Sequence, residues 1–133
     1  MSVIGPAHFI LYVSDQARAA AFYRAVLDCA PRLDVPGMTE FCLGTDAVLG
    51  LMPSAGIHRL LAPALPDPEA AAGVPRAELY LVVDDPGVFH ARALAAGARE
   101  LSPSLDRDWG HRVAYSLDPD GHVLAFARAL APR

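Results

Sequence analysis

The stretch ELYLVVDD, residues 78–85, repeats the pattern of HFILYVSD, residues 8–15, which lies earlier in the chain. His8 aligns with Glu78, and Asp15 aligns with Asp85. Each copy is an apolar run that ends in an aspartate and precedes a segment of helical character. A duplicated strand–helix unit constrains the architecture of the whole chain. The repeat therefore predicts two copies of one supersecondary unit in tandem.

The composition indicates one globular domain, or two small halves that share a core. The 133 residues are 53% hydrophobic and 20% charged, which is typical of folded chains. A formal net charge of -4 argues against nucleic acid as a partner. No apolar run reaches the roughly 18 residues of a membrane span, and residues 1–6 lack a signal-like basic region. We expect a cytoplasmic protein in which Cys29 and Cys42 are buried or half-buried free thiols.

The first half of the chain, about residues 8–52, predicts the element order βαβββ. Ser14 or Asp15 can cap a helix, because a short oxygen side chain accepts from free N–H groups of the first turn. Phe22 and Val26 lie at helical spacing on one apolar face. The expected elements are a strand over 8–13, a helix over 16–27 and strands over 32–35, 39–43 and 47–52.

Residues 53–77 are rich in proline and indicate a linker with a short helix near residues 56–61. The second half, about residues 78–128, repeats the order of the first. Asp85 and Pro86 suit a helix start, and Gly97 suits its end. The expected elements are a strand over 78–83, a helix over 86–96, a short strand over 99–101, a polar loop over 103–110, a strand over 111–117, a DPDG turn over 118–121 and a strand over 122–127.

This ordered set of features resembles the vicinal oxygen chelate superfamily of glyoxalase I, the bleomycin-resistance proteins and the extradiol dioxygenases. The features are the tandem βαβββ units, the first-strand pattern His-x-x-x-x-Val-Ser-Asp, Phe22-Tyr23 in the helix and the DPDG turn. Asp108-Trp109-Gly110 is similar to the Trp-Gly stretch of bleomycin-resistance-like members. The resemblance covers about residues 8–128. It implies an α+β fold with curved mixed sheets around a cleft, in a homodimer.

The resemblance also implies where a metal would be held. Metal-bearing members place ligands at positions that align with His8, Gly50, Glu78 and Ala125. Only His8 and Glu78 carry a donor side chain, whereas a catalytic divalent ion needs about three protein donors. We therefore expect no metal cofactor. The alternative is a divalent ion such as Zn, Ni, Mn or Fe, bound by His8, Glu78 and a further residue.

The side-chain alternation of the strands predicts the lining of the cleft. If His8 and Glu78 face it, they can form an ion pair that serves as acid and base, and they are the candidate catalytic residues. Gly50 and Ala125 are expected to widen the space. The expected ligand contacts are His8, Ile10, Tyr12, Met52, Glu78, Tyr80, Trp109 and Ala125.

A mostly apolar pocket with a few polar groups is typical of small-molecule sites. The favoured function is a binding protein that sequesters an aromatic or antibiotic-like ligand without a metal, as in antibiotic resistance. One alternative is a metal-dependent lyase, isomerase or dioxygenase that uses His8 and Glu78. Another is a metal-independent acid/base enzyme. We interpret His90 and His111 as surface residues without a role.

Overall fold

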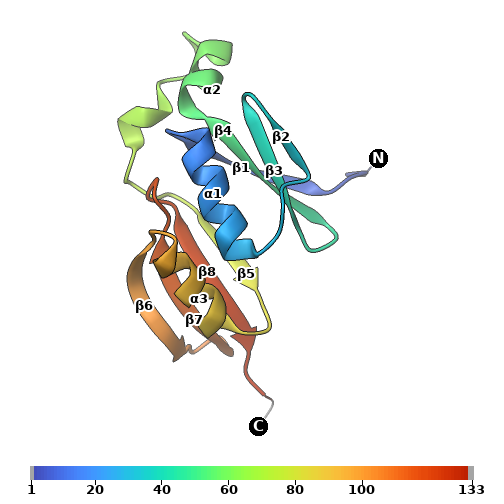
Figure 1. Ribbon diagram of the computed structural model, residues 1–133, viewed down its shortest axis with the longest axis vertical. Helices are drawn as coiled ribbons and strands as arrows, with labels where there is room; N and C mark the ends of the chain where they lie inside the picture. The colour runs from blue at the N-terminus through green and yellow to red at the C-terminus, as the bar shows by residue number, and fades with distance from the viewer. Residues whose placement is uncertain (1, 132–133) are drawn as a thin grey trace. The chain divides into compact units, whose positions relative to one another are not determined.

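The computed structural model describes residues 2–131 and contains two four-stranded sheets (Figure 1). The chain divides into two compact units, one made mainly of the first 70 residues and the other mainly of the rest. Met1, Pro132 and Arg133, at the ends of the expected 1–133 domain, lie outside the described residues. Each unit contains one βαβββ repeat, as the sequence predicts.

The first unit is built around a mixed sheet with the order β1-β4-β3-β2. Strands β1 and β4 are parallel, and the other pairs are antiparallel. Its elements are β1 (Ala7–Val13), α1 (Gln16–Leu27), β2 (Leu33–Val35), β3 (Met38–Leu43), β4 (Ala47–Pro53) and α2 (Ser54–Leu61). The short helix expected in the linker is thus present and begins two residues earlier. A 3-10 helix, η1 (Pro68–Ala71), follows it.

The second unit repeats the arrangement with the order β5-β8-β7-β6, in which β5 and β8 are parallel. Its elements are β5 (Glu78–Val82), α3 (Pro86–Ala95), β6 (Arg99–Asp106), β7 (His111–Leu117) and β8 (Val123–Ala129). The expected short strand over 99–101 with a polar loop over 103–110 is wrong. Strand β6 runs on through Pro103, because two register shifts break its ladder with β7 on either side of Ser102 and such irregularities tolerate proline.

The repeated aspartates cap equivalent helices. The side chain of Asp15 accepts a hydrogen bond from the backbone N–H of Arg18 at 3.0 Å. The side chain of Asp85 accepts one from Val88 N–H at 3.2 Å, with Pro86 in the first turn. Each cap satisfies an N–H group that has no partner inside the helix. The duplicated aspartate is therefore a structural part of the repeat.

The DPDG turn is held by one carboxylate. Asp118 Oδ1 accepts from the backbone N–H groups of Asp120 at 2.9 Å and His122 at 2.8 Å. Gly121 has a φ of 87°, which glycine adopts without strain. A Cβ at Gly121 would lie 3.0 Å from the Cα of Gly73 in the linker. The turn therefore needs glycine for both conformation and close packing.

The strand registers decide which residues share a face. His8 pairs with Val48 and Ile10 with Gly50, whereas Glu78 pairs with Val123 and Tyr80 with Ala125. Directly paired residues point to the same side of a sheet.

The opposite faces meet the helices, as predicted. In the first unit Gln16 of α1 bonds Thr39 at 2.9 Å, and Thr39 shares its face with Leu51 and Leu11. In the second unit the ring of Phe126 lies 5.7 Å from that of Phe89 on α3. The predicted ligand contacts from β1 and β5 therefore lie on the faces opposite α1 and opposite α3.

The expectation that Cys29 and Cys42 are buried or half-buried thiols is wrong, because both are exposed.

Candidate functional site

An ionic cluster lies on the face of the first sheet opposite α1. Glu40 on β3 is directly across from Gly50. Its Oε1 is 2.9 Å from Arg32 Nε, and its Oε2 is 3.4 Å from His8 Nδ1. The Glu40 side chain is only 12% exposed, compared with 42% for Arg32 and 37% for His8. A nearly buried carboxylate is thus held between a guanidinium and an imidazole.

Apolar side chains surround this ionic cluster. Ile10 and Tyr12 are 43% and 39% exposed, and Met52 is half-buried. A Cβ at Gly50 would lie 3.0 Å from Ile10 Cγ1 and 3.2 Å from Met38 Sδ. The prediction that Gly50 widens the space is therefore wrong, since neighbouring side chains already fill the room that the glycine leaves.

An aromatic hydrogen-bond chain lies on the face of the second sheet opposite α3. Trp109 Nε1 donates to the Tyr80 hydroxyl at 3.1 Å, and that hydroxyl lies 2.5 Å from His111 Nδ1. The Tyr80 hydroxyl has one proton and two lone pairs, so its role as donor or acceptor towards His111 follows the tautomer of the imidazole, while towards Trp109 it accepts. The rings of Tyr80 and His111 are stacked, with centroids 5.8 Å apart.

Tyr115 lies beside Tyr80, and Arg107 holds its ring in place. The Arg107 guanidinium carbon is 5.2 Å from the centre of the Tyr115 ring. Its Nη2 donates to Ser102 Oγ at 2.6 Å and to the carbonyl of Val113 at 3.0 Å. Its Nε–H is buried without a hydrogen-bond acceptor among residues 2–131, and the negative face of the ring compensates for part of that loss. Arg107 thus supports both the irregular strand β6 and the phenol.

The surroundings of Tyr115 favour its neutral form. Burial raises the pKa of the Tyr115 phenol, and the charges of Glu78 and Tyr80 raise it further, while Arg107 acts in the opposite direction. Removing a phenol from water disfavours the phenolate, and a neighbouring carboxylate repels it. The exposed carboxylate of Glu78 is therefore close enough to act on the aromatic cluster electrostatically.

Small apolar residues form the floor beneath these rings. Val113, Ala125 and Ala127 are fully buried, and Tyr80 and Tyr115 pack against them. The prediction that Ala125 widens the space is wrong, because Ala125 is fully buried in the group of residues against which both phenols pack. We call Tyr80, Tyr115, Trp109, His111 and Arg107 the aromatic cluster. Of the predicted ligand contacts, Glu78, Tyr80, Trp109 and Ala125 belong to this face.

The interpretation of two histidines as surface residues is wrong. His90 on α3 is 7% exposed and its Nε2 lies 2.8 Å from Glu100 Oε2. His111 is half-buried and bonded to Tyr80. His8 and Glu78 belong to different units, so their ion pair stays a prediction. The carboxylate that the structure places beside His8 is Glu40.

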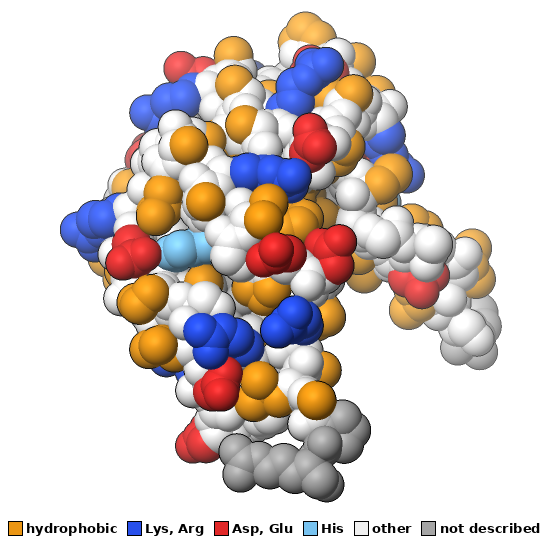
Figure 2. Space-filling view, turned by 60° about the horizontal axis from the view of Figure 1, so that its bottom comes forward, with side chains coloured by type: hydrophobic (Ala, Val, Ile, Leu, Met, Phe, Trp, Pro, Cys, Tyr) orange, Lys and Arg blue, Asp and Glu red, His pale blue; other side chains and the backbone are white. Residues whose placement is uncertain are grey.

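Charge is mixed on the face of the molecule that Figure 2 shows. In Figure 2, arginine and acidic side chains alternate over the visible face, with apolar side chains between them. Because positive and negative side chains are interspersed, this face produces no strong electrostatic potential of one sign. Among the described residues, no helix is both long and apolar enough to span a membrane.

The sequence pattern of the Glyoxalase family, described as the Glyoxalase/Bleomycin resistance protein/Dioxygenase superfamily, matches residues 5–126. The chain belongs to this superfamily. Solved structures with the same fold include a glyoxalase-related enzyme from Fulvimarina pelagi, with 22% identity and a TM-score of 0.78 over 95% of this chain and 88% of that one. A glyoxalase/bleomycin resistance protein/dioxygenase family enzyme from Burkholderia phytofirmans PsJN has 18% identity and a TM-score of 0.80 over 96% and 100%. No curated protein matches the chain.

The residues of this superfamily member do not fit the metal centre that the resemblance implies. Gly50 and Ala125 have no donor atom, and Ile10 and Tyr80 lie over those positions. Among residues 2–131, no group of three or more His, Cys, Asp or Glu side chains is placed to hold an ion. A catalytic divalent ion bound by fewer than three protein donors would be weakly held.

Proposed function

We propose that this chain is a small-molecule binding protein that sequesters a flat aromatic ligand on its aromatic cluster without a metal. The observation that carries the proposal is the arrangement of Tyr80, Tyr115 and Trp109. Tyr80 is fixed by hydrogen bonds from both sides, and Trp109 is 54% exposed. Fixed aromatic faces offer offset stacking to a planar ring at little conformational cost.

The charges around the cluster favour a cationic ligand. Glu78 is exposed beside Tyr115. The Nη2 of Arg107 is already bonded to Ser102 and to the Val113 carbonyl. The exposed carboxylate of Glu78 is thus more accessible to a ligand than the half-buried guanidinium of Arg107, and it attracts an ammonium or a protonated ring nitrogen.

The proposal keeps two expectations from the sequence. His8, Ile10, Tyr12 and Met52 of the first sheet remain proposed ligand contacts, and a homodimer remains the proposed assembly. Alanine variants at Ile10 and Tyr12 test the contacts one at a time, and sedimentation of the purified protein tests the assembly. Unchanged affinity in both variants would confine binding to the second sheet.

The experiment that tests the function is a titration of chelator-treated protein with proflavine, a planar cation. Trp109 is the only tryptophan of the chain, so quenching of its emission reports on the cluster. We expect saturable quenching, weaker binding in Tyr115→Leu and little binding of 9-anthracenecarboxylate, a planar anion. Arg59→Gln, in α2 of the other unit, is the control. Absence of saturation, or binding that requires an added metal, would overturn the proposal.

A second candidate function is a metal-independent enzyme that transfers protons. The observation that favours it is the order Arg32–Glu40–His8, in which a carboxylate held by a guanidinium faces an imidazole. A base whose second nitrogen is oriented by a carboxylate is a recurring catalytic arrangement. Here Glu40 takes the place that the sequence assigned to Glu78, and Nε2 of His8 is the nitrogen that would exchange a proton with substrate.

Deuterium uptake tests this second function without knowledge of the natural substrate. Dihydroxyacetone in deuterated buffer with a chelator is followed by proton NMR, which detects exchange at the carbon beside the carbonyl. An acid/base enzyme accelerates this exchange, and both His8→Ala and Glu40→Gln abolish the acceleration. Equal exchange in the two variants and the parent protein would exclude this pair as the base.

A further inference from the structure

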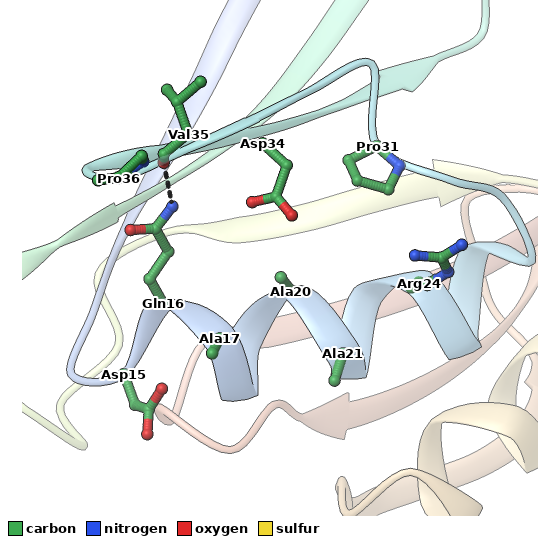
Figure 3. A pocket seen from close by; sticks show the side chains of 10 residues that line it. All are labelled: Asp15, Gln16, Ala17, Ala20, Ala21, Arg24, Pro31, Asp34, Val35 and Pro36. Carbon is green, nitrogen blue, oxygen red and sulfur yellow. Dashed lines mark hydrogen bonds between the residues drawn. The ribbon is translucent and has the colours of Figure 1, made fainter.

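A groove of about 660 Å³ lies between α1 and the β2–β3 hairpin, on the face of the first sheet opposite the ionic cluster. Figure 3 shows β2 as its roof and α1 as its floor. Its lining residues are Asp15, Gln16, Ala17, Ala20, Ala21, Arg24, Pro31, Asp34, Val35 and Pro36. The groove is separate from both clusters described above, and neither proposed function uses it.

Gln16 fixes one end of the groove. Its Nε2 donates to the Val35 carbonyl at 2.8 Å and to Thr39 Oγ1 at 2.9 Å. Its Oε1 accepts from the backbone N–H of Gly37 at 2.9 Å. All the polar atoms of this side chain are therefore engaged in joining the first turn of α1 to the hairpin. The spacing between floor and roof is set by the protein before any ligand arrives.

A buried hydroxyl orients the acidic group of the groove. Thr39 is fully buried and its Oγ1 donates to Asp34 Oδ1 at 2.9 Å. Thr39 receives the Gln16 hydrogen bond on the same oxygen, so its own proton is directed to Asp34. In Figure 3 the Asp34 carboxylate points from β2 towards α1, above Ala20. One carboxylate oxygen is thus held, and the other is left for a ligand.

A cation without a partner stands further along the groove. Arg24 reaches from α1 towards Pro31 (Figure 3) and makes no hydrogen bond or ion pair with any residue from 2 to 131. Ala17, Ala20 and Ala21 keep the floor between the two charged groups low. Asp15 caps the helix and points away from the space in this view.

We propose that this groove binds a small zwitterion, with its ammonium group on Asp34 and its carboxylate on Arg24. Charge-assisted hydrogen bonds to a carboxylate and to a guanidinium are stronger than neutral ones. A ligand with one charge would satisfy one group and leave the other in contact only with water. The groove therefore selects molecules that carry both charges at the right separation, such as ω-amino acids, over their singly charged analogues.

The test is an NMR titration of the full chain with ω-amino acids from glycine to 6-aminohexanoate. We expect saturable shifts of the backbone amide signals of residues 16–24 and 33–35, largest for one chain length. Butylamine and butyrate serve as singly charged probes and should bind at least about tenfold more weakly, the ratio that loss of one charge-assisted contact produces. Equal affinity for zwitterion and butylamine would overturn the proposal.

Substitutions test the contribution of the charges and the contribution of the shape of the groove separately. Asp34→Asn keeps an oxygen for Thr39 but removes the charge, and Arg24→Gln removes the cation. Each should weaken the preferred zwitterion by about tenfold. Ala20→Leu should also block binding, because it fills the floor without altering a charge. Arg18→Gln, on the same helix outside the lining, is the matched control. Affinity that survives both charge changes, in variants with parent-like circular dichroism, would rule out the site.

Discussion

Glu40 and Tyr115 occupy the same place in two sheets of the same strand order. Each lies on the third strand of its repeat, directly opposite Gly50 in one sheet and Ala125 in the other. Glu40 is held by Arg32, and Tyr115 packs under Arg107. One repeat thus uses an arginine to pair a carboxylate, and the other uses an arginine to support an aromatic ring.

The first strands diverge in the same way. Ile10 and Tyr80 align in the repeat and pair with Gly50 and Ala125 respectively. Ile10 is 43% exposed, whereas the hydroxyl of Tyr80 is tied to His111. A common backbone therefore carries an open aliphatic face with an ionic centre and a fixed aromatic face. The comparison assigns charge chemistry to the first sheet and ring stacking to the second.

The largest expected difference between the two faces is how much stability each loses when a small residue is replaced by a larger one. Ala125→Leu should lower the free energy of unfolding by about 3 kcal/mol, and Gly50→Leu by about 1 kcal/mol, within the usual range for overpacking. Ala125 is fully buried in the group of residues against which Tyr80 and Tyr115 pack, whereas the half-exposed Ile10 can move aside. Urea unfolding measures both, with the exposed Ala55→Leu as control. Equal losses would mean that the first face is as tightly packed as the second.

The ionic centre of the first sheet should show measurable coupling. In a double-mutant cycle of Glu40→Gln and Arg32→Gln, we expect a coupling energy of about 1 kcal/mol, discounted because Arg32 is partly exposed. The pair Asp106–Arg112 has a similar distance of 2.8 Å, but its side chains are 60% and 41% exposed. It should couple by roughly half as much or less. If the Asp106–Arg112 pair coupled more strongly than the Glu40–Arg32 pair, the burial of Glu40 would not strengthen its ion pair.

The raised pKa of Tyr115 makes the stability of the second unit depend on pH in the alkaline range. Because the folded state holds the phenol proton more tightly, this contribution to stability is present below the ordinary pKa of 10.0 and is lost as the pH rises through the higher folded value. Glu78→Gln removes a charge that raises this pKa, so it should move the phenolate transition of Tyr115 to lower pH. Ultraviolet absorbance follows the titration, and Tyr115→Phe identifies the transition. An unchanged transition in Glu78→Gln would place that carboxylate too far away to matter.

The sequence predicted the repeat, the helix caps and the faces of the strands, because these depend on local alternation and on short oxygen side chains. The positions of Ile10 and Tyr80 on faces away from the helices follow from a period of two. The partners of Glu40 and His111 could not be found in this way. They depend on the register between neighbouring strands and on side-chain reach, which a single sequence leaves open.

Strand β6 shows a second limit of sequence reasoning. Pro103 between two serines is typical of a loop, and only the register shifts around Ser102 keep this segment in the sheet. Arg107 supports those register shifts through its hydrogen bonds to Ser102 and to the Val113 carbonyl. Its role could not be predicted from the sequence, because an arginine in a segment expected to be a polar loop is common. The groove beneath β2 was missed for a similar reason, since Arg24 and Asp34 come from two elements that only the folded chain brings together.

The smallest expected effect concerns the hydrogen bond that links Tyr80 to His111. His111→Phe removes the partner of this bond and keeps an aromatic ring beside Tyr80, so the Tyr80 hydroxyl is free to turn and the environment of Trp109 should change. We expect a small shift in the emission maximum of Trp109, measured at constant pH. Tyr80→Phe removes the hydroxyl that binds both Trp109 and His111, so it should shift the emission in the same direction, at a cost of about 1 kcal/mol in unfolding free energy. If the emission of His111→Phe matched that of the parent protein, the fixed orientation of Tyr80 would have to come from its packing and from the Trp109 bond alone.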